Sequence, residues 1–73
     1  MTPALLARSR AALGYSRQEL ADALGVRKET VYRWEIGKSP IGNPERLRGE
    51  VLALLAERGM EIERLQQELD RAA

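Results

Sequence analysis

The side chains that could do chemistry in this sequence are basic and acidic groups, because it contains neither cysteine nor histidine. This composition removes disulfides, thiolate metal sites, and the commonest metal ligand and general base near neutral pH. The carboxylates are expected mostly on exposed helical faces, where they do not converge as an acid–base pair would. We therefore expect no enzyme, no metal, no cofactor and no small-molecule ligand.

The charges are divided unevenly along the chain, although the formal net charge is only +1. Residues 1–43 carry seven basic and four acidic side chains, a balance of +3, and residues 44–73 carry five basic and seven acidic, a balance of −2. The first part can face a polyanion, and the second would be repelled by one. Random scatter in a short chain could give the same imbalance, so alone it favours a polyanionic partner only slightly.

Helical periodicity runs through the whole sequence, and no segment alternates as a strand would. Thr2 with Pro3 is typical of a helix start, and Ser16 with Glu19 has the spacing of a capping box. We expect helices over residues 3–13, 17–24, 28–36 and 44 to 58 or 59, followed by a helical pattern over 60–73. Gly59 either divides the last helix or is tolerated at a cost of about 1 kcal/mol. The expected fold class is all-α, a compact bundle of four or five short helices.

The most informative stretch is the pair of short helices joined by a turn at residues 24–27. Gly25 can adopt the positive φ that a sharp turn between helices needs, and Ala21 is small where the two helices must cross. Apolar residues stand where this pair must pack on the first helix: Leu20, Leu24, Val26, Val31 and Trp34.

Residues 15–37 as a whole resemble the Xre/Cro phage-repressor family of helix-turn-helix proteins. The resemblance rests on Gln-Glu-Leu-Ala at 18–21, Leu-Gly-Val at 24–26 and Thr-Val-Tyr-Arg-Trp-Glu at 30–35, and it extends over roughly residues 4–55. It implies a small helical bundle whose third helix docks in the major groove of double-stranded DNA, usually as a dimer. Arg27 departs from the family pattern, because it stands where Ser or Thr often caps the third helix, so the cap must come from elsewhere or from a DNA phosphate.

The resemblance also implies which side chains meet DNA, since the start of the third helix enters the groove. With Val31 and Trp34 facing inward, the opposite face carries the expected base-contacting residues, Arg27, Lys28, Glu29, Tyr32 and Arg33. Expected phosphate contacts come from Arg17, Thr30, Lys38 and Ser39. A single basic residue is more often merely solvated, but five of them clustered around this motif favour DNA.

Two opposite charges are expected to pair inside the bundle. Glu35 is acidic on a helix that should otherwise face DNA, and Arg10 is the only charge on the apolar face of the first helix. We expect a structural Arg10–Glu35 ion pair, as the resemblance also suggests.

Apolar residues continue at three- and four-residue steps to the end of the chain, interrupted by Arg58, which is close to a heptad pattern. The first half of this helix could simply cover the bundle, whereas the second half has nothing left to cover. We expect a helix-turn-helix domain over residues 1–57 and an amphipathic helix over 58–73 that forms a homodimer, with fraying in solution as the alternative. The expected dimer contacts are Val51, Leu55, Ile62, Leu65 and Leu69.

The function that these features favour is a sequence-specific transcriptional regulator, most simply a homodimeric repressor of an inverted-repeat operator. The alternative is an antitoxin or adaptor whose C-terminal helix binds a partner protein. No apolar run approaches the roughly 20 residues that cross a bilayer, and no signal-peptide pattern is present. We therefore expect no membrane association and a cytoplasmic location, and the family resemblance implies a bacterial or phage-infected cell.

Overall fold

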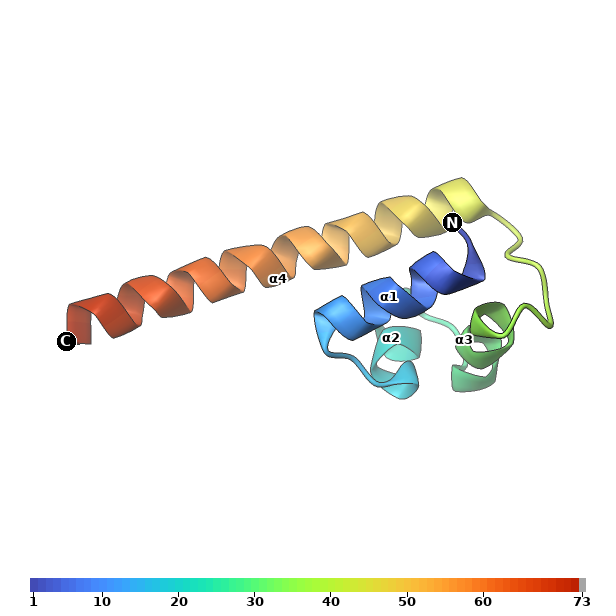
Figure 1. Ribbon diagram of the computed structural model, residues 1–73, viewed down its shortest axis with the longest axis horizontal. Coiled ribbons are helices and arrows are strands. Elements are labelled where there is room, and N and C mark those ends of the chain that lie inside the picture. The colour runs from blue at the N-terminus through green and yellow to red at the C-terminus, as the bar shows by residue number, and fades with distance from the viewer. Residues whose placement is uncertain (73) are drawn as a thin grey trace.

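The computed structural model describes residues 1–72 and forms four helices, α1 (Pro3–Leu13), α2 (Arg17–Leu24), α3 (Lys28–Glu35) and α4 (Pro44–Ala72) (Figure 1). No strand occurs within these 72 residues, so the expected all-α fold class is confirmed. α4 is a single helix of 29 residues that passes through Gly59 without a break, rather than two short helices. No helix in the described part of the chain combines the length and the apolar character that a membrane span requires.

Side chains cap three of the four helix starts. Thr2 Oγ1 accepts a hydrogen bond from the Leu5 amide at 3.2 Å, and Asn43 Oδ1 accepts one from the Arg46 amide at 3.1 Å. At α2 the capping box is complete, because Ser16 Oγ accepts from the Glu19 amide and a Glu19 carboxylate oxygen accepts from the Ser16 amide. Hydrogen bonding to the carboxylate, first from the Ser16 amide and then from the Ser16 side chain, lowers the pKa of the Glu19 carboxyl, so the stabilisation from the box is present above the ordinary carboxyl pKa and is lost as the pH falls through the lowered pKa.

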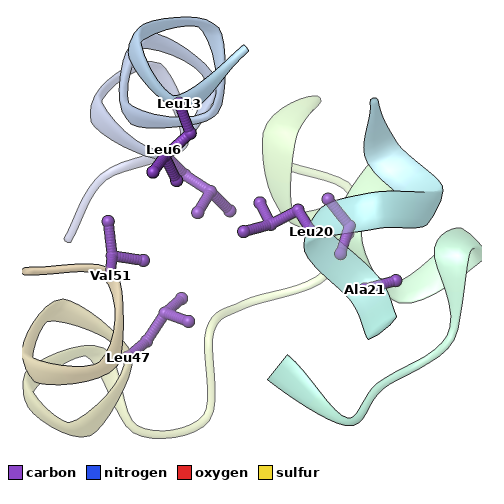
Figure 2. Packing of buried hydrophobic residues seen from close by; sticks show 7 residues of the cluster. Leu6, Leu13, Leu20, Ala21, Leu47 and Val51 are labelled. Carbon is purple, nitrogen blue, oxygen red and sulfur yellow. The ribbon is translucent and has the colours of Figure 1, made fainter. Parts of the chain in front are cut away.

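The core is small and entirely apolar. Its buried residues are Leu6, Leu13, Leu20, Ala21, Val31, Leu47 and Val51. Figure 2 shows Leu20 reaching from α2 toward Leu6 and Leu13 of α1, with two α4 residues, Leu47 and Val51, closing the other side. Because α1 contacts both α3 and α4 while α2 packs on α3, this cluster fixes the helix pair relative to the rest of the bundle.

The two halves of α4 have different surroundings. Leu54 and Leu55 are the last residues of α4 that pack against the core, and every side chain from 56 to 71 is exposed. Figure 1 shows this second half extending past α1 and α2 into open space, which accounts for the 49 Å length of the molecule. The division expected between residues 57 and 58 therefore falls inside a continuous helix, shortly after its contacts with the bundle end.

One of the expected dimer contacts is corrected by this packing. Val51 is only 1 % exposed and belongs to the core of its own chain, so its side chain is not available to a second chain. A three- and four-residue spacing does not distinguish burial within a chain from burial between chains, which is why the sequence placed Val51 with the exposed residues. The exposed apolar side chains of this face begin further along, at Ile62.

Candidate nucleic-acid interface

The turn between α2 and α3 is built around Gly25, which has a φ of 71° in the left-handed region. A side chain at this position would be strained, because Cβ disfavours that conformation. The turn is closed by the Val26 amide, which donates to the Ala21 carbonyl at 3.0 Å. Because Ala21 is fully buried and small, α3 can pack closely against α2 at an angle fixed by the turn.

The inner side of α3 is anchored in the bundle, which leaves its other side facing solvent. Val31 is fully buried, and Trp34 is partly buried and packs against the core, as expected. The outer side holds all five residues that the sequence assigned to base contacts, and each is exposed: Arg27, Lys28, Glu29, Tyr32 and Arg33. The fold thus brings these side chains together on one open surface.

Of the residues assigned to phosphates, Thr30 lies within α3, and Lys38 and Ser39 lie in the loop that follows it. Lys38 is exposed, and Thr30 and Ser39 are partly buried. The loop after α3 is held against the helix end, because the Arg33 carbonyl accepts hydrogen bonds from the amides of Lys38 at 2.9 Å and Ser39 at 3.4 Å. The backbone of Lys38 and Ser39 is therefore held in place beside the end of α3.

The structure contains the ion pair expected between Arg10 and Glu35. Arg10 Nε and Nη2 donate to the two Glu35 carboxylate oxygens at 2.7 and 3.1 Å, and Arg10 Nη1 donates to the Tyr15 carbonyl at 3.0 Å. The hydrogen bonds with Glu35 raise the pKa of the Arg10 guanidinium. This bidentate pair links α1 to the end of α3 and keeps the Glu35 side chain, only 4 % exposed, out of solvent.

Sequence reasoning missed the way in which Arg17 joins this pair. Arg17 Nε donates to Glu35 Oε1 at 3.3 Å, and its guanidinium carbon lies 5.1 Å from the centre of the Tyr32 ring. The spacing of Tyr32 and Glu35, three residues apart on one helix, could have indicated that both reach the same neighbour. That this neighbour is the first residue of α2 depends on how the two helices cross.

The charge on this surface is mainly positive. Among residues 1–72, four of the basic side chains here make no ion pair: Arg27, Lys28, Arg33 and Lys38. Arg27 is the N-cap residue of α3 but makes no side-chain capping bond, as expected, so the first amides of the helix have no side-chain acceptor at this position. Glu29 is the one acidic residue among the five on the outer face of α3.

Comparison with known protein families matches residues 6–44 to the family described as Helix-turn-helix. The chain belongs to the helix-turn-helix family. Within that family it is of the Xre/Cro-like type, and it is a DNA-binding transcription regulator. No curated protein and no solved structure matches the chain. The matched part of this helix-turn-helix protein runs from within α1 to the first residue of α4, so it includes α2 and α3 and leaves nearly all of α4 outside the match.

Proposed function

We propose that this helix-turn-helix protein is a homodimeric repressor that reads an inverted-repeat operator with α3 in the major groove. The observation that carries the proposal is the open outer face of α3, where three cations free of ion pairs among residues 1–72 stand opposite a side that is fixed in the core: Arg27, Lys28 and Arg33. A convex helical surface of this kind has the dimensions to enter the major groove of B-form DNA.

The charged side chains on the outer face each suit a group on DNA. Lys28 and Arg33 can donate to guanine O6 and N7, and Glu29 can accept from the cytosine amino group. Arg27 lies at the start of α3, where it can reach a base edge. Contacts to the phosphates would set the register of the helix, from Arg17 at the start of α2, from Thr30 in α3, and from Lys38 and Ser39 in the loop after α3.

We propose that the free half of α4 associates with the same segment of a second copy. Ile62, Leu65 and Leu69 are 46, 58 and 69 % exposed, and they continue the face by which α4 closes its own core. Leu55 lies at the inner end of this face. The flanking charges are mixed in sign, with an Arg58–Glu61 pair at 3.8 Å, which suits a like partner better than a strongly charged one.

Dimerisation would have two consequences for function. It would bury apolar surface in support of a small core, and it would place two copies of α3 about 34 Å apart, one turn of DNA. Two-fold symmetry in the protein then requires an inverted repeat in the operator. Occupation of a promoter is the simplest mechanism for such a module, and it would operate where the DNA lies, in the cytoplasm of a bacterial or phage-infected cell.

The competing proposal is an antitoxin or adaptor in which the free half of α4 binds a different protein. The same exposed residues support it, because a partner helix could cover Ile62, Leu65 and Leu69 equally well. Light scattering separates the two proposals. A homodimer at micromolar concentration favours the repressor, and a monomer favours the adaptor.

Selection from random duplex DNA followed by sequencing tests the proposed operator symmetry. On the selected operator, Arg33→Ala is expected to cost about 1–3 kcal/mol and to relax the preference at one base pair, because a bidentate contact to guanine is lost. Fluorescence anisotropy on the operator and on single-base variants measures both effects. Arg64→Ala, an arginine on the exposed half of α4, is the matched control and should bind as the wild type does. Unchanged affinity and unchanged base preference in Arg33→Ala would contradict the assignment.

A further inference from the structure

Arg17 is held in place by two different groups of α3. Its Nε donates to Glu35 Oε1 at 3.3 Å, and its guanidinium lies over the Tyr32 ring, with 5.1 Å between the guanidinium carbon and the ring centre. The cation–π distance is within the range in which the ring face attracts a cation. Arg17 nevertheless remains 40 % exposed, so the side chain is fixed without being enclosed.

Glu35 gives this arrangement a rigid base. Its carboxylate is only 4 % exposed and is also bound by Arg10, in a bidentate pair that anchors it to α1. Two arginines share one carboxylate, so the three side chains together carry a net charge of +1. That remaining charge lies on the accessible partner, Arg17, beside the outer face of α3.

The free part of the Arg17 guanidinium is available to an anion. Its Nε is engaged by Glu35, whereas no hydrogen bond among residues 1–72 engages Nη1 or Nη2. A shallow hollow beside it is lined by Arg17, Lys28, Glu29 and Tyr32. Because Glu29 contributes a carboxylate to this hollow, a phosphate would lie toward the Arg17 and Lys28 side of it.

We propose that Tyr32 is a positioning residue, which together with Glu35 holds the Arg17 guanidinium as a preformed clamp for one DNA phosphate. The inference rests on the proposed docking of α3 and changes the role of Tyr32 from reading a base to supporting a phosphate contact. A planar guanidinium can bind a phosphate through two N–H groups, and a side chain that is already ordered loses less entropy on binding. A contribution that acts through a phosphate is the same for every DNA sequence.

A double-mutant cycle of Arg17→Ala and Tyr32→Ala tests this role on two probes, the selected operator and a duplex of scrambled sequence. We expect Tyr32→Ala to weaken binding to both duplexes by about two- to fivefold, the range of an exposed cation–π contact. In the Arg17→Ala background the same change should have no further effect, because its whole contribution passes through Arg17. Tyr32→Phe keeps the ring and should bind both duplexes as the wild type does.

Arg17→Lys gives a second test. If Arg17 acted only through its charge, this variant would bind DNA with the wild-type affinity. Lysine keeps the charge, and hence most of the dependence of binding on salt, but it cannot present a planar guanidinium to the ring while donating to Glu35. We therefore expect the salt slope to stay near the wild-type value while the affinity falls toward that of Arg17→Ala.

Three results would overturn the inference while leaving the proposed function standing. They are a loss confined to the operator with a relaxed preference at one base pair, independent effects of Arg17→Ala and Tyr32→Ala, and a loss of affinity in Tyr32→Phe. A wild-type protein that binds neither duplex at low ionic strength would overturn the proposed function itself. Both side chains are partly or fully exposed, so circular dichroism is expected to show unchanged helix content in every variant.

Discussion

Replacing Leu65 and Leu69 together with aspartate is expected to convert the proposed dimer into a monomer and to lower operator affinity by about a hundredfold or more. The physical reason is that two carboxylates would have to be buried without partners at the centre of an apolar contact. The bundle should be unaffected, because these side chains are 58 and 69 % exposed and touch nothing in their own protomer's core. Light scattering gives the oligomeric state, and anisotropy with the full operator and with one half-site gives the affinities.

The matched control places the same two charges on the opposite side of the helix. Met60→Asp with Gln67→Asp changes residues seven apart, roughly half a turn around α4 from Leu65 and Leu69. This variant should remain dimeric and bind the operator as the wild type does. A dimer that persists with aspartate at both Leu65 and Leu69 would contradict the proposed contact. Equal losses of operator affinity in the two double variants would show that the added negative charge repels DNA, without any role for dimerisation.

Leu20→Ala is expected to reduce the free energy of unfolding by about 2–5 kcal/mol. Leu20 is fully buried and extends from α2 toward Leu6 and Leu13 of α1, so its loss opens a cavity in a small core (Figure 2). Small domains are stable by about 5–15 kcal/mol, so the change removes a large fraction of the total. Because Leu20 also fixes the helix pair on α1, binding to every duplex should weaken at temperatures where the variant begins to unfold.

Urea denaturation followed by circular dichroism measures this change, at one protein concentration because dimerisation would contribute to stability. Leu52→Ala is the control, since it makes the same chemical change on α4 at a side chain that is 48 % exposed. We expect its effect to stay below about 1 kcal/mol. Equal losses at Leu20 and Leu52 would show that the core described here does not determine the stability of the protein.

Much of the bundle could be predicted from the sequence because its local signals agree with one another. The first three expected helices begin and end within one residue of α1, α2 and α3. In this part of the chain, capping residues and glycines mark the ends of segments with a clear helical periodicity. The Arg10–Glu35 pair was predictable for a different reason. Arg10 is a charge on an apolar helix face, and Glu35 is an acid on a helix whose exposed face is mainly basic. An ion pair between these two opposite charges accounts for both unexpected residues.

The course of α4 could not be decided from the sequence. Glycine at position 59 destabilises a helix by about 1 kcal/mol. This cost can end the helix, or the hydrogen bonds of the turns on both sides can outweigh it. α4 continues through Gly59, and the residues on either side are good helix formers. The same ambiguity affected Val51, because an apolar stripe specifies that a face is covered without specifying by which chain.

The contact of Arg17 with Tyr32 and Glu35 lay beyond sequence reasoning for a geometric reason. Residue types established a cation at the start of α2 and an aromatic ring on the outer face of α3. Whether the two meet depends on the crossing of the helices, which is set by the turn at Gly25 and the small contact at Ala21. The sequence therefore predicted these residues near one surface and left their mutual contacts to the structure.

Titration of the isotope-labelled protein with the selected duplex, followed by backbone amide NMR, tests the central claim most directly. If α3 enters the major groove, the largest shift changes will fall on residues 27–33, with a second group at the start of α2, and a scrambled duplex will give weaker changes at the same places. Changes confined to residues 56–71, or none at low ionic strength, would contradict the claim that this surface reads DNA.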